Sequence, residues 1–226
     1  MIAQTSPTGL AGNETLDALR LRLAPLVAAN AAFDGWGAPA VALAADQAGV
    51  DRDIAALAFD GGAMVMIDAW FAAVDGAMIE RCAPEALAAL GIRARITALV
   101  EARLAILAPH REALRRAQAI LAMPTHLAAA ARLGWRAADQ MWRAAGDTAV
   151  DYNHYSKRAI LGGVYAATLL VFVGDESEDF AQTRAFLARR IEGVMRFEKA
   201  KARLSGRADR HFSVARFVGR LRYRGH

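Results

Sequence analysis

The sequence predicts an all-α protein, and three observations support this. Apolar residues recur at the three- and four-residue spacing of a helix through most of the chain. Alanine supplies much of the 55% hydrophobic share, and alanine-rich segments that are poor in β-branched residues favour helix. No segment of convincing length alternates apolar and polar residues as a half-buried strand does. With 226 residues, the chain is long enough to bury a full hydrophobic core.

The first part of the chain predicts short helices. Residues 1–13 are polar and contain glycine and proline, which predicts a disordered N-terminus. An amphipathic helix is expected from Glu14 to about Asn30, followed by a second helix at 39–47. A tight turn at Gly49 separates the second helix from a short third one at 51–59. Because two short helices joined by a glycine-containing turn have the shape of a helix-turn-helix, residues 14–62 are predicted to form such a region.

Longer helices are expected in the rest of the chain. Their breaks fall at Pro109 and Pro124, because proline is tolerated in the first turn of a helix but not in its interior. A short element is expected near residues 84–90. The apolar pattern places the longer helices at residues 64–80, 92–108, 110–122 and 125–145.

Two more helices are predicted after residue 150. Asp151 has the chemistry of an N-cap for a helix that runs to Val173 and stops at Gly174. Ser177 is expected to cap the next helix, with two acidic residues in its first turn. The inward-facing positions of that last helix are Phe180, Leu187, Ile191 and Val194.

The longest uncharged run, residues 159–174, has sixteen residues. This is shorter than the ~20 residues that span a bilayer, so we expect a buried helix of a soluble protein. The first basic residue is Arg20, and we therefore expect neither a secretion signal nor a transit peptide.

The residue types argue against catalysis and metal binding. Cys82 is the single cysteine, which excludes an internal disulfide and a cysteine-based zinc site and favours a reducing compartment. A di-iron bundle needs histidines that stand three residues after a glutamate, and this sequence has none. Asp151 and His154 have one-turn spacing but no second pair. Phosphate-binding, nucleophile-elbow and dinucleotide motifs are missing too, so we expect no catalytic residues, no metal and no enzyme activity.

The helix-turn-helix region has the wrong charges for DNA. Its second short helix, "DRDIAALAF", has one cation and two acids, whereas phosphate contacts need several donors or cations. We interpret the region as vestigial and expect no nucleic-acid partner. A ligand-sensing transcriptional regulator that kept its DNA reader remains the alternative.

Charge is concentrated at the C-terminus. The net charge is +5, yet nine cations and one acid lie between Lys199 and the end. Apolar residues there follow the spacing i, i+3, i+4, i+7, with arginines off the stripe, which is typical of a helix on a membrane surface. A tail that docks on its own body, or a disordered basic end, remains open. The expected membrane-binding residues are Val214, Arg216, Phe217, Val218, Arg220 and Leu221.

A polar cluster begins the helix at 151. In a helix, Asp151, Tyr155 and Arg158 share roughly one face, and His154 borders it. Downstream, two glycines at 162 and 163 are costly in a helix unless another helix or a ligand approaches closely. From the residues alone, a docking surface and an ordinary solvated first turn are equally supported.

Four stretches of the sequence carry a family resemblance. "WRAAGDTAVDYNHYSKRAILGGVYAATLLVF" and "SEDFAQTRAFLARRIEGVM", with "FDGWGAPAVALAADQAGV" and "VEARLAILAPHREALRRAQAILAMP" upstream, resemble the coenzyme Q (ubiquinone) biosynthesis accessory family, the ninth of the yeast Coq series. The resemblance covers residues 14–198. It implies a TetR-like fold that has lost DNA binding, with a lipid-binding and dimerisation core at 63–203 and a basic amphipathic tail at 204–226.

The resemblance also implies a function. Members of this family are non-catalytic, bind isoprenoid lipids or quinone intermediates, and support the demethoxyubiquinone hydroxylase at the membrane. It implies a homodimer, peripheral to the inner membrane on the cytoplasmic side, with a bound lipid or isoprenoid quinone instead of a cofactor. The alternative then becomes a TetR-type ligand-responsive transcriptional regulator.

The resemblance assigns candidate site residues. Large apolar side chains on facing helices are candidates for the lipid pocket, although most of them suit a plain core equally well. His154 departs from the family pattern, because relatives carry tryptophan there. The partner-facing patch falls on Asp139, Met141, Trp142, Asp151, His154, Tyr155 and Arg158. The lipid candidates are Trp70, Phe71, Leu104, Trp135, Trp142, Leu161, Val164, Tyr165 and Phe186.

Overall fold

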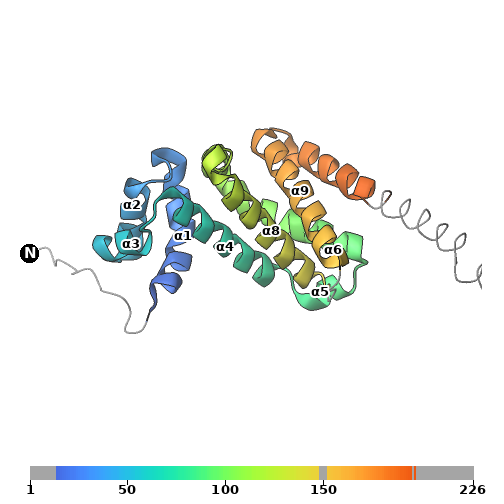
Figure 1. Cartoon of the computed structure of the whole chain (residues 1–226), viewed down its shortest axis with the longest axis horizontal. Coiled ribbons are helices and arrows are strands. Elements are labelled where there is room, and N and C mark those ends of the chain that lie inside the picture. The colour runs from blue at the N-terminus through green and yellow to red at the C-terminus, as the bar shows by residue number, and fades with distance from the viewer. Residues whose placement is uncertain (1–13, 148–151, 195, 197–226) are drawn as a thin grey trace, which may run out of the picture.

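The computed structural model describes residues 14–147, 152–194 and 196. This part of the chain consists of helices joined by short turns, with no strand among the described residues (Figure 1). The all-α prediction is confirmed. The expected disorder of residues 1–13, the Asp151 cap and the basic tail at 204–226 lie outside the described residues.

Three helices form one end of the molecule: α1 (Leu16–Asp34), α2 (Ala38–Ala48) and α3 (Arg52–Ala58) (Figure 1). Thr15 starts α1 by accepting a 3.2 Å hydrogen bond from the backbone of Ala18. Gly49 ends α2 in the left-handed conformation, at φ 66°. Asp51 then caps α3 and accepts hydrogen bonds from the two backbone N–H groups at 53 and 54. Local residue chemistry therefore explains the two short helices and the turn between them.

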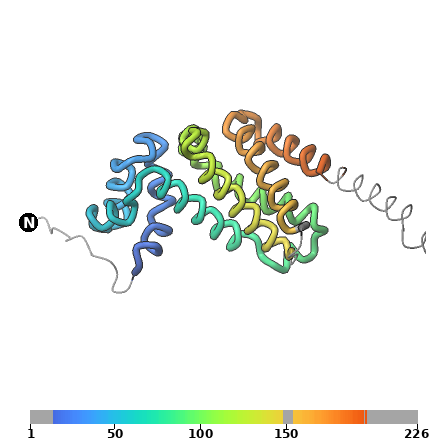
Figure 2. Tube along the Cα trace, viewed as in Figure 1, coloured from blue at the N-terminus to red at the C-terminus, as the bar shows by residue number. Residues whose placement is uncertain are grey.

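The longer helices form the rest of the molecule. Helix α4 (Ala63–Arg81) runs from the α1–α3 end into this larger part (Figures 1 and 2). Short 3-10 turns begin at Ala108 and Pro124, so the predicted proline breaks are confirmed. The last helical stretch, residues 181–194, lies beside α9 (Figure 2). The other helices are α5 (Pro84–Ala88), α6 (Ile92–Leu107), α7 (Arg111–Leu121), α8 (Leu127–Ala144) and α9 (Tyr152–Gly174).

The turn before residues 181–194 is organised by Asp175, a residue that the sequence analysis did not select. Ser177, the predicted cap, does accept a 3.1 Å hydrogen bond from the backbone of Gln182. Buried Asp175 accepts four hydrogen bonds, from the backbone and hydroxyl of Ser177 and from the backbone and hydroxyl of Thr183, at 2.5–2.9 Å. Burial alone would raise the pKa of Asp175, but these hydrogen bonds outweigh it and hold the pKa well below its usual range.

A buried polar network crosses the core. Arg103 on α6 donates to Asp75 on α4, and its Nε lies 2.9 Å from the hydroxyl of Tyr165 on α9. Arg136 on α8 also reaches Asp75, at 3.2 Å, and Asp68, at 2.6 Å. Because a buried charge that loses its partner is costly, this network favours one relative placement of the four helices.

Helix α9 is buried on one face only, which corrects the expectation of a buried helix. Leu161, Tyr165 and Phe172 point into the core, whereas Leu170 is 67% exposed. By length and composition, residues His154–Gly174 are apolar enough to cross a membrane, with a mean hydropathy of 1.4, and 39% of that window is buried. The helix therefore presents an uncharged outer face as well as an inner one.

Candidate functional site

An apolar cavity of about 320 Å³ lies where α6, α8, α9 and residues 181–194 meet. Its wall is apolar except for Arg93, Ser156 and Lys157. Every one of the four helical segments contributes at least one lining side chain, so the cavity exists only in the assembled tertiary structure. The lining residues are Ile92, Arg93, Ile96, Trp142, Ser156, Lys157, Ile160, Leu161, Val164, Ile191 and Val194.

One glycine of α9, Gly162, lies close against helix α8. A Cβ at Gly162 would lie 3.4 Å from the carbonyl oxygen of Gly134, which is tighter than most real contacts. The sequence predicted a close approach at these glycines, and at Gly162 the approaching element is helix α8. A Cβ at Gly163 would meet nothing within 4 Å, so this glycine has no such role among the described residues.

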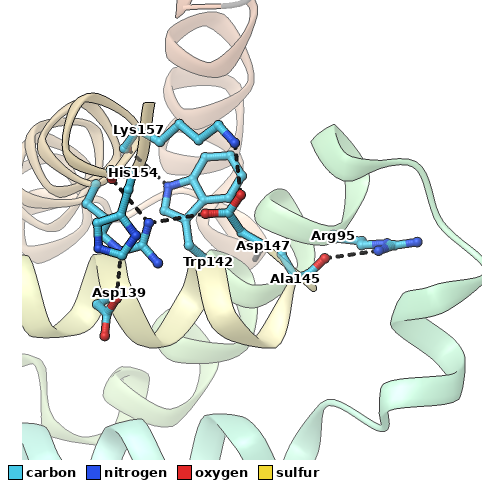
Figure 3. Close-up of polar contacts among 8 residues, drawn as sticks. Arg95, Asp139, Trp142, Ala145, Asp147, His154 and Lys157 are labelled. Carbon is cyan, nitrogen blue, oxygen red and sulfur yellow. Dashed lines mark hydrogen bonds and ion pairs between the residues drawn. The ribbon is translucent and has the colours of Figure 1, made fainter. Parts of the chain in front are cut away.

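Trp142 lines the cavity and also contacts a polar cluster at the start of α9. Its indole Nε1 donates a 3.1 Å hydrogen bond to the backbone carbonyl of Lys157. The Lys157 ammonium lies 5.3 Å from the centre of the Trp142 ring and 2.8 Å from an Asp147 carboxylate oxygen (Figure 3). Lys157 is therefore held across the indole by a carboxylate in the segment that follows α8.

Arg158 holds the same junction from within. It is 2% exposed, and its guanidinium donates to Asp139 at 2.6 Å, to Asp147 at 3.1 Å and to the carbonyl of His154 at 3.1 Å. Burial would raise the pKa of Asp147, but hydrogen bonds from Lys157 and Arg158 outweigh it and lower the pKa. The end of α8 and the start of α9 are thus joined by an ion-pair network (Figure 3).

A second arginine supports the turn after α8. Arg95 at the start of α6 donates to the carbonyl of Ala145 at 2.9 Å (Figure 3). It also donates to the carbonyls of Ala88 and Leu90, at 2.8–2.9 Å. One guanidinium therefore connects the ends of α5 and α8 with the first turn of α6, next to the cavity wall formed by Ile92 and Ile96.

The predicted partner patch separates into an exposed part and a buried frame. Tyr155 is 62% exposed, and its ring centre lies 6.0 Å from that of Trp135 and 5.2 Å from that of His154. Met141 and Arg158, by contrast, are buried. Asp139 belongs to the ion-pair network, Trp142 to the cavity wall, and Asp151 lies outside the described residues. The role of the patch in partner binding stays a prediction.

The structure distributes the predicted lipid residues over several places. Leu161, Val164 and Trp142 line the cavity. Trp70, Phe71, Leu104 and Tyr165 are buried in the core, Trp135 lies on the outer face, and Phe186 lies under the guanidinium of Arg190 at 4.9 Å.

Sequence reasoning did not select five of the apolar lining residues for the lipid site. Ile191 and Val194 were predicted to face inward, and Ile92 and Ile96 have one-turn spacing, but sequence spacing does not show which helices face each other across a cavity. The five unselected lining residues are Ile92, Ile96, Ile160, Ile191 and Val194.

Within the described ranges, no group of three histidine, cysteine, aspartate or glutamate side chains is placed to hold a metal ion.

The fold and site thus define a class: an all-α protein with an apolar cavity of about 320 Å³ beside an exposed aromatic face. A model of the COQ9 protein family matches residues 127–198, which contain α8, α9 and most of the cavity wall. The chain belongs to the COQ9 family.

Several proteins named "Ubiquinone biosynthesis protein COQ9, mitochondrial" are similar to this chain. The Bos taurus protein is 32% identical over 169 residues, which cover 71% of this chain and 52% of the relative. The Rattus norvegicus protein is 42% identical over 96 residues, covering 42% and 31% respectively. The Xenopus tropicalis protein is 30% identical over 168 residues, covering 71% and 53%. This chain spans about half the length of the Bos taurus and Xenopus tropicalis relatives.

Proposed function

We propose that this chain is a non-catalytic, lipid-binding accessory protein of ubiquinone biosynthesis. In this proposal it holds an isoprenoid lipid or quinone intermediate in the cavity and supports the demethoxyubiquinone hydroxylase at a membrane. The observation that carries the proposal is the apolar cavity of about 320 Å³, whose wall includes the first turns of α9. Membership of the COQ9 family supports the biosynthetic role, since relatives are named as ubiquinone biosynthesis proteins.

The cavity suits a hydrocarbon ligand by size and chemistry. Small-molecule pockets typically measure ~300–1,000 Å³ and are mostly apolar, with a few polar groups that orient the ligand. Transfer of apolar surface from water contributes roughly 25 cal/mol per Å², so a branched hydrocarbon chain would bind here without specific polar contacts. The methyl-rich wall of isoleucine, leucine and valine complements such a chain.

The exposed aromatic face would dock the hydroxylase. Aromatic side chains contribute most of the binding energy at many interfaces, and Tyr155 and Trp135 are exposed next to each other. Ser156 and Lys157 follow Tyr155 directly and line the cavity. In the proposal, the ligand and the partner therefore meet at the same end of α9, which suits delivery of a hydrophobic substrate.

Attachment to a membrane and dimer formation complete the proposal. Residues 204–226 would lie on the bilayer surface as a basic amphipathic helix. The uncharged outer face of α9, with Leu170 exposed, offers an apolar surface for a second copy. The relatives are named as mitochondrial proteins, so they do not support the cytoplasmic location that the resemblance suggested. The proposal keeps only the peripheral place at a membrane.

A TetR-type transcriptional regulator is the alternative, because α2 and α3 are two short helices joined by a glycine-containing turn. The charges on α3 oppose it. Arg52 is engaged with Asp46 at 2.5 Å, and the exposed surface also carries Asp53 and Leu57. A salt-dependent shift of duplex DNA at micromolar protein would favour the regulator.

Native mass spectrometry with lipid extraction tests the proposed cavity. We expect the purified chain to carry a near-stoichiometric isoprenoid quinone or phospholipid. Val164→Trp and, independently, Ile160→Trp should leave the protein empty, because both side chains line the cavity. Leu170→Trp is the matched control, because it adds the same bulk to the outer face of α9. A wild-type chain that stays empty after incubation with isoprenoid quinone would overturn the lipid-binding part of the proposal.

A further inference from the structure

We propose that the cavity selects amphiphiles with an anionic head group, and that arginines at its openings, Arg93 on one side and Arg189 and Arg190 on the other, attract that head. The proposal rests on the lipid-binding function proposed above and specifies the class of ligand. An isoprenoid chain or acyl chain would fill the apolar cavity, while a carboxylate or phosphate would remain at the surface near these guanidinium groups.

Two more open hollows adjoin the cavity and bring the arginines to it. One shares Ile160, Val164 and Val194 with the cavity, and Arg189 and Arg190 form part of its wall. The other shares Ile92 and Arg93 with the cavity and runs along the first turns of α6. The apolar cavity therefore opens on two sides, and arginine side chains lie at each opening.

The positive charges of these three arginines are only partly balanced by carboxylates of the described residues. All three are exposed, and none of them forms an ion pair within 4.0 Å in the described part of the chain. Arg190 stacks on Phe186, at 4.9 Å from the ring centre. The other cation of the cavity, Lys157, is different because it is paired with Asp147.

Two carboxylates lie near Arg93 and reduce its contribution. Glu101 lines the hollow along α6. Glu192 is hydrogen-bonded to Arg196, which is the main cause of its lowered pKa, and Arg93 adds a weaker attraction. The hollow beside Arg189 and Arg190 has no carboxylate among its lining residues, so no lining residue offsets the two guanidinium charges there.

The charge at these openings also argues against other occupants. The C-terminal segment from Lys199 onward has nine cations and one acid, so the three arginines would repel it. A free phosphate would gain nothing from the apolar wall. Guanidinium groups bind carboxylates and phosphates through paired, charge-assisted hydrogen bonds, which is the contact that an anionic lipid head would complete.

The proposal is tested by measuring how tightly the full-length protein binds four probes that share a sixteen-carbon chain and differ in the charge of the head group. The probes are hexadecanoate, hexadecyl phosphate, hexadecanol and hexadecyltrimethylammonium, each used below its micelle concentration in competition with a fluorescent fatty alcohol. We expect one or both anions to bind roughly tenfold more tightly than the alcohol, which corresponds to about 1.4 kcal/mol. The cation should bind most weakly, and added salt should narrow the differences because it screens exposed charges.

The variant R93Q/R189Q/R190Q should remove the preference. The readout is the ratio of anion to alcohol affinity, so a general weakening of binding leaves it unchanged. Arg184→Gln is the matched control, since Arg184 is exposed on the same helical stretch but lines none of the three hollows. A preference for hexadecanoate alone, or for hexadecyl phosphate alone, would identify the head as a carboxylate or a phosphate.

Several outcomes would overturn the proposal, and they differ from a failure of the proposed function. Equal affinity for anion and alcohol in the wild-type chain would reject charge selection and leave lipid binding intact. Loss of the preference in R184Q, or in the tail variant R216Q/R220Q, would place its origin away from the openings. If none of the four probes binds, lipid binding in the cavity fails as well.

Discussion

The indole of Trp142 and the backbone of Lys157 are joined by a 3.1 Å hydrogen bond, while the Lys157 ammonium lies over the same indole. Trp142 thus faces the apolar cavity with part of its surface and the polar α8–α9 junction with its N–H group. This pair connects the proposed lipid site with the helix start that carries Tyr155.

Tyr155→Ala should weaken association with the demethoxyubiquinone hydroxylase while thermal stability stays nearly unchanged. The side chain is 62% exposed, so its removal leaves no cavity in the core. Pull-down affinity and a melting curve measure both effects. Leu57→Ala, at an exposed apolar position on α3, is the control. A collapse of folding in Tyr155→Ala would show that this residue belongs to the core.

His154→Trp should tighten the complex with the hydroxylase. The imidazole lies 5.2 Å from the Tyr155 ring, and a larger aromatic side chain would extend the exposed aromatic face. Interface tryptophans often contribute ~2 kcal/mol or more to binding. Titration calorimetry of both proteins measures the change. Weaker binding would mean that this chain uses an interface arranged around the imidazole.

Removal of residues 210–226 should abolish sedimentation with anionic liposomes. The deleted segment contains the predicted apolar stripe and its flanking arginines, and each cation near an anionic lipid surface contributes ~1 kcal/mol. Neutral liposomes provide the control for the electrostatic part. Unchanged sedimentation of the shortened chain with anionic liposomes would reject the tail as the membrane anchor.

Arg158→Met should destabilise the protein by about 3–5 kcal/mol, since it leaves Asp139 and Asp147 without their buried partner. Arg143→Met is the matched control. Arg143 also contacts Asp139, at 2.7 Å, but its side chain is 67% exposed, so we expect a loss of about 1 kcal/mol or less. Urea unfolding of both variants measures the difference. Equal losses of unfolding free energy in the two variants would show that the burial of Arg158 does not make its ion pairs more important for stability.

Asp175 should make stability depend on pH in the acidic range. Its pKa in the folded protein is below the value of an unfolded chain, ~3.9. Its contribution to stability is therefore fully present above that value and is lost as the pH falls toward the folded pKa. Asp175→Asn should be less stable at neutral pH, and its stability should fall less steeply below pH ~4. The free energy of unfolding is measured against pH for both proteins. If it fell equally steeply with pH in both, Asp175 would not be the source of the acid dependence.

Local chemistry allowed much of the fold to be predicted. Proline at 109 and 124, the glycine at 49 and the carboxylate of Asp51 each act on their own backbone or the next few residues, so their effect is visible in the sequence. Hydrophobic spacing likewise placed the long helices within a few residues of their observed ends. The cap at Asp175 was missed because one of its partners, Thr183, lies eight residues away.

The candidate site was only partly predictable, for a different physical reason. The family resemblance of the stretch at 142–158 predicts a partner-facing patch at the start of α9, and it also assigned Trp142, Leu161 and Val164 to a lipid site. Nothing in the spacing of Ile92 or Val194 shows that these side chains meet across one cavity. The burial of Arg158, in contrast to the exposure of Tyr155 three residues earlier, depends on how α8 packs against α9.

The sequence by itself determined the all-α class and most helix ends, because capping, proline sterics and helical periodicity act over a few residues. Only the tertiary structure decided which side chains enclose the cavity, which arginines lie at its openings and which charges pair in the core. Residues about a hundred positions apart come together in this way, since Ile92 and Val194 line the same cavity. Their positions depend on how whole helices pack against one another.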